Sequence, residues 1–566
     1  MISGRCLGLA LGLCVVSASG ASAQTSGKAA AVPDIVVDGS TDAQSPWRRA
    51  ESAHVIVTST ASEAELKRVT NTLERLYALM SRLYRAKDAP DDTVKLQITL
   101  VDSADFFRTM KLRNLRSEEG PYPRAFATER YYDPREDGAV LVVARADQVI
   151  DLDTKLSEDQ DYQDAANSGD SSAAINVNAN HPPISRPWEA MLYSAFAQHF
   201  MLTYQPAAYP RWYIDGIGAL FSTIRVRQDG SLEYARPPLD YFKVFRAYGD
   251  LNVRDILTGA YLDAPTKAHW TPYHAWLLAH YFLFSKLSAE RSEQFRAYMT
   301  AVQQGKPLAE AAKVFGDIRK IQYAVGGYAG NTKDFARAAP VDTPGGDPLI
   351  TTLPRSSAAL IEERIALGSR LAATDPAGVA TRSDWLAQIH RKVERLPYNA
   401  ETILTEAEAD CRGGAYAECG AAADHVIAKT PDDGRALAWK GIAQTHLALA
   451  GPASERAAGL ATARKTISAA IHQDRDAPMA LIAAFQSYTE AGEAVPDRAM
   501  LAMAEVIREV PDAPAPRLYL AQELVRQGKT ELARGVLHNV LYGPYDSPEK
   551  TAAAALFAGG AQAAAR

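Results

Sequence analysis

The fold of this chain is decided by the stretch MLYSAFAQHFM at residues 191–201 and by YPRWYIDGIGALFST at 209–223. Around the first stretch, apolar side chains and one histidine recur three and four positions apart, at Trp188, Met191, Leu192, Ala195, Phe196 and His199. This spacing predicts a helix that is buried in the protein core. We therefore interpret His199 as a core histidine whose hydrogen bonds are satisfied inside the protein.

Both stretches resemble the core of the gluzincin-type, peptidase-MA-like metallohydrolases. In that family one helix carries His-Glu-x-x-His, and the next helix carries a third, acidic ligand in a Trp-x-x-Glu-Gly-x-Ala context. In this sequence the positions of His, Glu and His hold Ser194, Ala195 and Gln198. The position of the acid holds Asp215. The resemblance covers about 46–325, and it implies an α+β fold with a degenerate metal site.

Each replacement removes a separate part of the zinc chemistry. In an active site two histidines four positions apart share the zinc ion with the acid, and the glutamate accepts a proton from the metal-bound water. A hydroxyl at Ser194 and an amide at Gln198 are poor zinc ligands compared with imidazole. Ala195 has no proton acceptor, and loss of a general base alone costs about a hundredfold to ten-thousandfold in rate. We therefore expect a pseudopeptidase that has lost its zinc, with no catalytic residues.

The role of the altered site stays open at this point. Ser194, Gln198 and Asp215 form a candidate vestigial cleft, which they either fill with a hydrogen-bonded network or use to bind a peptide without cleaving it. Asp215 is equally compatible with a carboxylate near a helix start, stabilised by the helix dipole. Gly216 and Gly218 do not complete a nucleotide-binding fingerprint, so they indicate a helix–helix contact. An alternative function is a metal-dependent hydrolase in which Asp215 and residues from elsewhere hold the metal.

Residues 1–23 predict a secretory signal peptide. Arg5 precedes the apolar run LGLALGLCVV, and a small-x-small cleavage signal ends at Ala23. The run is too short to cross a bilayer, so we expect an exported, periplasmic protein without a membrane span. The chain holds 61 basic and 67 acidic residues, which gives no electrostatic footprint for a nucleic-acid partner.

A polar leader at 24–45 precedes an α+β subdomain at 46–150. Its β-α-β-α-β order predicts a small sheet covered by helices, with strands at 54–58, 94–101 and 138–144. Ser62 and Glu65 form the pattern of a capping box that opens the first helix. A polar insertion at 151–185 then leads to the helical gluzincin-like subdomain at 186–338, and a Pro/Gly-rich stretch at 339–355 predicts a linker.

Residues 356–566 predict an all-α helical-repeat solenoid. Glycines recur between pairs of amphipathic segments, at 414, 451, 492 and 528. The pattern resembles tetratricopeptide repeats, which implies stacked helical hairpins with a groove for a peptide or protein partner. We expect this array to fold separately from 24–338. One further hypothesis is that the repeats alone carry the function and that the front domain is structural.

Two cysteines, Cys411 and Cys419, remain once the signal peptide is removed. They flank the turn of one predicted hairpin, and an oxidising compartment permits a disulfide between them. Two cysteines alone do not make a zinc site. The identity of the partner and the oligomeric state are not determined by the sequence.

Overall fold

The computed structural model describes residues 42–84, 93–110, 112, 130–150, 184–238, 252–263, 271–329, 335–371 and 376–563. The expected signal peptide, most of the polar leader and most of the polar insertion lie outside the described residues. No helix among these described ranges combines the length and the apolar character needed to cross a membrane.

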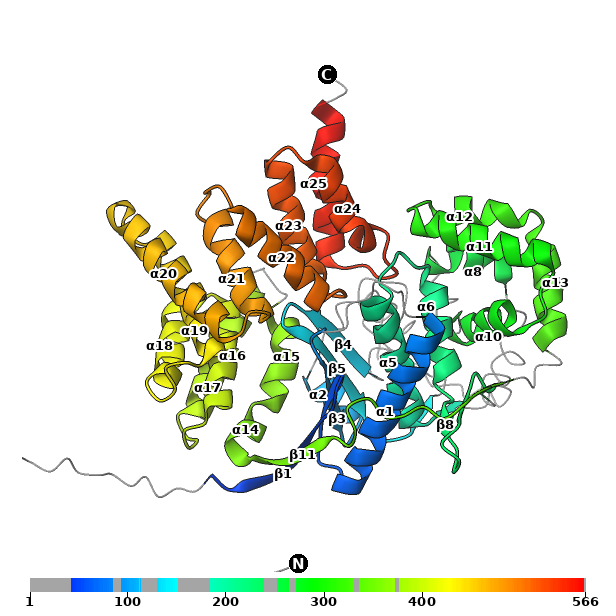
Figure 1. Cartoon of the computed structure of the whole chain (residues 1–566), viewed down its shortest axis with the longest axis horizontal. Coiled ribbons are helices and arrows are strands. Elements are labelled where there is room, and N and C mark those ends of the chain that lie inside the picture. Colours follow the sequence, from blue (N-terminus) through cyan, green and yellow to red (C-terminus); the bar gives the residue numbers. More distant parts are fainter. Residues whose placement is uncertain are drawn as a thin grey trace, which may run out of the picture. The chain divides into compact units, whose positions relative to one another are not determined.

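A six-stranded mixed sheet forms the centre of the α+β part (Figure 1). Its strand order is β11 (Leu349–Pro354), β1 (Gln44–Glu51), β2 (Val55–Ser59), β3 (Leu96–Val101), β5 (Gly138–Ala144) and β4 (Arg130–Arg135). β2, β3 and β5 run parallel, and the outer strands pair antiparallel. The three predicted strands are present, because their β-branched runs suit positions buried on both faces of a sheet.

The two faces of the sheet are covered by different parts of the chain. On one face, Leu141 and Val143 belong to the same core as α1 (Glu63–Tyr84) and α5 (Trp188–Tyr204). On the other face, Val140 and Val142 pack with α2 (Asp105–Met110) and with Ile365 of α15 (Ile361–Leu371). The alternation follows from the two-residue period of a strand. α1 begins at the predicted cap, where the Glu65 backbone N–H donates to Ser62 Oγ at 3.2 Å.

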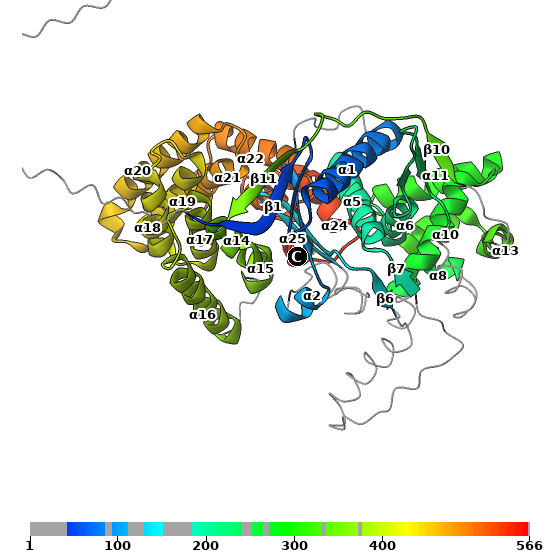
Figure 2. The same cartoon turned by 90° about the horizontal axis from the view of Figure 1, so that it is seen from below.

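The stretch 339–355, interpreted from the sequence as a linker, contains β11. This strand pairs antiparallel with β1 from Glu51 opposite Leu349 to Arg48 opposite Thr352, and Figure 2 shows the two side by side. The β-branched residues of β11 suit a strand, and without them the backbone of β1 would be left as a free edge. This part of the stretch therefore belongs to the sheet of the α+β part.

Three helices bring the gluzincin-like segments together. α6 (Arg211–Phe221) lies between α5 and α10 (Thr271–Phe284). A Cβ atom added at Gly218 would lie 2.8 Å from Ser194 Oγ of α5, and one at Gly216 would lie 2.6 Å from Ala279 Cβ of α10. Both glycines thus permit close helix–helix contacts, which confirms their interpretation from the sequence.

The C-terminal part is rich in helices, as the sequence predicts. After α14 (Arg355–Ala359), α15 and α16 (Pro376–Val393) come four helical hairpins, and α25 (Pro548–Ala563) follows them. The hairpins pair α17 (Ala400–Gly413) with α18 (Tyr416–Ile427), α19 (Gly434–Ala450) with α20 (Ala453–Gln473), α21 (Pro478–Thr489) with α22 (Asp497–Glu509), and α23 (Pro514–Arg526) with α24 (Thr530–Leu541). The four recurring glycines lie in the turns of these hairpins.

Candidate functional site

The structure brings two of the three polar residues of the candidate cleft, Gln198 and Asp215, into direct contact. Ser194 and Gln198 lie one turn apart on α5, and Asp215 lies on the facing helix α6. All three are buried, with 6–7% of their surface exposed. Gln198 Nε2 donates a hydrogen bond of 3.1 Å to Asp215 Oδ1. Ser194 lies against Gly218 of α6.

Two arginines complete this site. Arg130 of β4 donates from Nη2 to Gln198 Oε1 at 2.5 Å, and Arg211 donates from Nε to Asp215 Oδ2 at 3.3 Å. Arg211 also lies against the ring of Tyr545, 4.2 Å from the ring centroid. The sequence analysis missed both arginines. The spacing of Arg211 and Asp215, four apart on one helix, is a signal that could have identified the first.

The arrangement has a clear chemical consequence. The side-chain oxygens of Gln198 and Asp215 accept hydrogen bonds from the guanidinium groups of Arg130 and Arg211. These groups carry the positive charge that a bound metal ion would otherwise supply. Within the part of the chain that the structure describes, no three or more His, Cys, Asp or Glu residues are grouped to hold a metal ion. Gln198 and Asp215 thus belong to one hydrogen-bonded network with Arg130 and Arg211.

His199 is fully enclosed beside this network. Its Nδ1 atom lies 2.8 Å from the Tyr132 hydroxyl and 3.8 Å from a carboxylate oxygen of Asp512. The Tyr132 hydroxyl donates to the same carboxylate. The side chain is thus a core histidine with hydrogen-bond partners, as the sequence predicts. Asp512 belongs to the turn between α22 and α23, so the helical array reaches the gluzincin-like helices here.

Helices α17 and α23 are the first helices of the first and fourth hairpins, and we call the sides of them that carry Arg412 and Tyr519 the A-helix face. The turn between β4 and β5 contacts it through Glu136 and Asp137. Arg412 of α17 donates to Glu136 at 2.7 Å and to Asp137 at 3.3 Å. The hydroxyl of Tyr519 on α23 also donates to Glu136, at 3.2 Å. The same Arg412 donates from Nε to Glu408 at 3.1 Å.

The pKa values of Glu136 and Asp137 depend on the arginines beside them. Burial by itself would raise the pKa of Glu136, but the charge and hydrogen bond of Arg412 hold the pKa below its ordinary value. The pKa of Asp137 is also lowered, because the cations Arg412 and Arg364 outweigh its burial. The resemblance to tetratricopeptide repeats predicts a groove in the array for a peptide or protein partner. In the structure, the turn of the chain's own α+β part occupies this region of the A-helix face.

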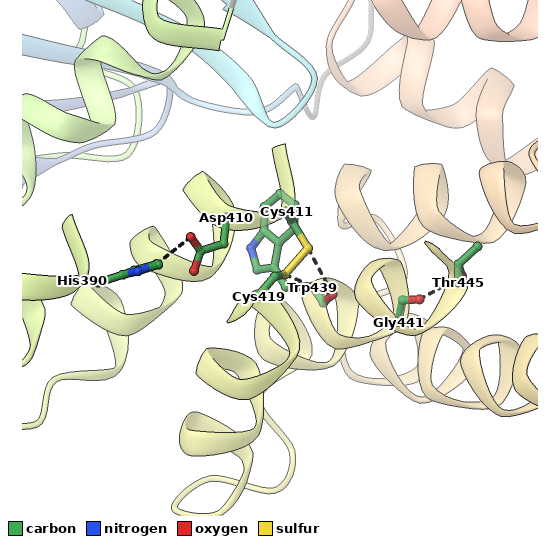
Figure 3. The surroundings of a disulfide bond; sticks show 7 residues. All are labelled: His390, Asp410, Cys411, Cys419, Trp439, Gly441 and Thr445. Carbon is green, nitrogen blue, oxygen red and sulfur yellow. Dashed lines mark hydrogen bonds and ion pairs between the residues drawn. A yellow bond between two sulfur atoms is a disulfide. The ribbon is translucent and has the colours of Figure 1, made fainter. Parts of the chain in front are cut away.

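A disulfide links the two helices of the first hairpin. Cys411 on α17 and Cys419 on α18 are bonded, with their Cα atoms 5.2 Å apart. Both sulfur atoms are buried and lie 3.6 Å from the Trp439 carbonyl oxygen of α19. Figure 3 shows this contact, and beside it the hydrogen bond of Asp410 to His390 of α16. The disulfide therefore lies where the first and second hairpins meet.

Comparisons with known proteins add little to this geometry. No family model matches the chain, and no curated protein matches it. Among solved structures, the chain is similar to a thermophilic TPR protein from Thermus thermophilus at 17% identity and a TM-score of 0.30. The match covers 35% of this chain and 98% of that one. The class of protein defined by the fold is an α+β sheet domain joined to an array of helical hairpins. The resemblance to gluzincins stays a prediction.

Proposed function

We propose that this chain is an exported, non-catalytic pseudopeptidase that acts as a protein-binding scaffold. The observation that carries the non-catalytic assignment is the pair of guanidinium groups on Gln198 and Asp215. A divalent cation bound at these oxygens would lie close to two positive charges in a buried site, where charge repulsion is strong. The same two contacts stabilise the buried amide and carboxylate without a metal.

The scaffold role is supported by the helical hairpins. Each hairpin buries its apolar residues against its neighbours, as the shared cores of the array show. Stacked helical hairpins present an extended surface that suits protein or peptide partners. Because the α+β part covers the region around Arg412, a partner would bind the array at a different surface. Leu501 on α22 and Leu532 on α24 lie on such open surface, with 71% and 62% of their area exposed.

Site-specific photo-crosslinking in periplasmic extract tests the scaffold role. A photoreactive residue at Leu501 or Leu532 is expected to give one reproducible adduct with a partner. The matched control carries the same residue at Tyr323, which is 80% exposed on α13 (Ile318–Ala329), outside the array. Adducts formed from Tyr323, with none formed from either array position, would contradict binding through the array.

Elemental analysis of the mature protein tests the non-catalytic assignment. After dialysis the protein is expected to hold no stoichiometric zinc and to cleave no peptide substrate. If one zinc ion per chain stays bound in the presence of a weak chelator, the result would support the alternative function, a hydrolase with a variant metal site. The measurement does not depend on the crosslinking result, so the two halves of the proposal are tested separately.

Export to an oxidising compartment is also part of the proposal. The signal-like residues 1–23 and the disulfide between Cys411 and Cys419 support it, because disulfides persist mainly outside the reducing cytosol. Cell fractionation combined with thiol labelling of the non-reduced protein tests this assignment. The expected result is a periplasmic protein, cleaved near residue 23, without free thiols. A cytosolic protein with two free thiols is the opposing outcome.

A further inference from the structure

A cavity of about 110 Å³ lies where the helical array meets the α+β part. Its walls come from the end of β4, the end of α5 and the segments 511–517 and 539–549 of the array. Pro206, Pro511, Pro514 and Pro544 line much of it, and these rings give rigid apolar walls. The polar groups on the walls include Arg517 and Glu549.

Arg517 is a partly buried cation with unused hydrogen-bonding capacity. Its Nε atom is buried and has no hydrogen-bond partner among the residues that the structure describes. Its two terminal nitrogens make only long contacts with backbone oxygens, at 3.4 Å to Val536 and 3.3 Å to Pro511. Burial lowers the pKa of Arg517 to about 10, and only the charge of Asp512 opposes this effect. Buried donors are rarely left unpaired without a reason.

The nearby aspartates are already engaged by other groups. Asp512 accepts a hydrogen bond from Tyr132, and Asp133 accepts hydrogen bonds from Arg135 at 2.6 Å and from the Tyr131 hydroxyl at 3.2 Å. Glu549 is a further carboxylate on the wall, in the first turn of α25. The lining of the cavity therefore combines a guanidinium group, that of Arg517, with a carboxylate, that of Glu549.

We propose that this cavity binds a small α-amino acid such as glycine or alanine. The α-carboxylate would pair with the guanidinium of Arg517, which presents its N–H groups in the planar arrangement that a carboxylate matches. The α-ammonium group would lie toward Glu549. A purely apolar molecule is disfavoured, because it would displace water from the charged side chains of the lining without hydrogen-bonding to them. The site is separate from the altered gluzincin motif, so it goes beyond the proposed scaffold function.

Stability measurements separate this proposal from a purely structural role for Arg517. A structural arginine would be needed for folding, and its loss would destabilise the protein. A buried charge kept for a ligand destabilises the empty protein, so an apolar replacement is neutral or stabilising. Arg517→Met is therefore expected to unfold at the same temperature as the wild type or higher. The exposed Arg498 on α22 gives a matched control, Arg498→Met.

Calorimetric titration of the full mature chain tests the ligand. Glycine and alanine are expected to bind saturably, acetate to bind more weakly, and methylamine not to bind. Arg517→Met is expected to weaken glycine binding by at least about tenfold, as a lost charged hydrogen-bond pair would. Glu549→Gln should weaken glycine binding and leave acetate binding unchanged.

Three results would overturn the proposal. The first is the absence of saturable binding of glycine and alanine to the wild type. The second is equal glycine binding by wild type and Arg517→Met, with Arg498→Met as the reference. The third is equal binding of acetate and glycine with no effect of Glu549→Gln, which would exclude recognition of the ammonium group.

Discussion

Single residues decide what the site around Gln198 and Asp215 can hold. Ser194 and Gln198 are poorer zinc ligands than imidazole, and Arg130 and Arg211 donate hydrogen bonds to the oxygens of Gln198 and Asp215. The site is therefore a network in which the positive charge comes from the protein itself.

Restoring the motif alone is expected not to restore the metal site. The four changes Ser194→His, Ala195→Glu, Gln198→His and Asp215→Glu leave both guanidinium groups beside the new ligands, and these groups would repel a divalent cation. Adding Arg130→Ala and Arg211→Ala to this set is expected to permit stoichiometric zinc binding, measured by elemental analysis after dialysis. Circular dichroism serves as the folding control. Stoichiometric zinc in the variant that keeps Arg130 would show that charge repulsion does not matter.

A pair of carboxyl groups on α17 is expected to make stability depend on pH. The pKa of Glu406 is raised to about 7, mainly by burial. The charge of His390 lowers this pKa, and the charge of Asp410 raises it. Burial likewise raises the pKa of Asp410 to about 6, despite its hydrogen bond to His390. Between the ordinary carboxyl pKa and about 7, the folded state thus binds more protons than the unfolded state. The free energy of unfolding therefore falls as pH rises through this window.

Glu406→Gln is expected to remove much of this fall in the free energy of unfolding. The expected gain in stability at pH 8 is about 1–2 kcal/mol, once solvent screening of the partly exposed side chain is allowed for. Urea denaturation at pH 5 and pH 8 measures it. Glu531→Gln is the matched control, because Glu531 is an exposed carboxylate on α24. An identical pH dependence in wild type and Glu406→Gln would refute this role.

At the scale of elements, the hairpins of the array depend on their turns. Gly414, Gly492 and Gly528 have φ values of 87°, 69° and 75°, a left-handed conformation that favours glycine. Gly451, at φ −78°, ends α19 without that conformation. The recurring glycine in the sequence therefore marks the hairpin turn in all four repeats, although the backbone requires glycine in only three of them.

The disulfide of the first hairpin is expected to stabilise the array modestly. It closes a short loop, with a sequence separation of 8, so the chain-entropy model predicts roughly 2–3 kcal/mol. Replacing Cys411 and Cys419 together by alanine should lower the unfolding midpoint in urea accordingly. Reductant should produce a similar fall in the wild type and none in the double variant. A midpoint unchanged by both treatments would mean that packing around Trp439 supplies the stability instead.

At the scale of the whole molecule, the array and the α+β part are joined by more than a connecting segment. β11 completes the sheet, and α15 covers one of its faces. The backbone N–H of Val94 donates to the Glu509 carbonyl oxygen at 3.0 Å. The turn carrying Glu136 is bound by Arg412. These contacts make the two parts energetically dependent on each other.

A fragment of residues 24–338 is therefore expected not to fold stably. It lacks β11, which leaves β1 as a free edge, and it lacks α15, which leaves the face around Val140 and Val142 open. A fragment of 24–371 restores both elements and should resist limited proteolysis better. Cooperative thermal unfolding of 24–338 at the temperature of the full chain would contradict this dependence and support separately folding parts.

The contact between the A-helix face and the β4–β5 turn is expected to stabilise the full chain. Arg412→Ala leaves Glu136, Asp137 and Glu408 together without their shared cation. Breaking a fully buried ion pair in this way costs about 3–5 kcal/mol, but 18% of the Arg412 and Glu136 side chains is exposed, so the expected loss is about 1–3 kcal/mol. Chemical denaturation measures the loss, with Arg498→Ala on exposed surface as the control. A loss no larger than that of the control would mean that the turn only lies against the array.

The sequence by itself determined features that depend on nearby residues. The cap at Ser62, the buried helix α5 and the hairpin turns all follow from short-range spacing and side-chain chemistry. Only the tertiary structure decided that Arg130 meets Gln198, 68 positions away, and that Arg412 meets Glu136, 276 positions away. It also decided that part of an apparent linker became β11. These pairings depend on which surfaces and strand edges the folded chain brings together, and no local pattern of residues contains that information.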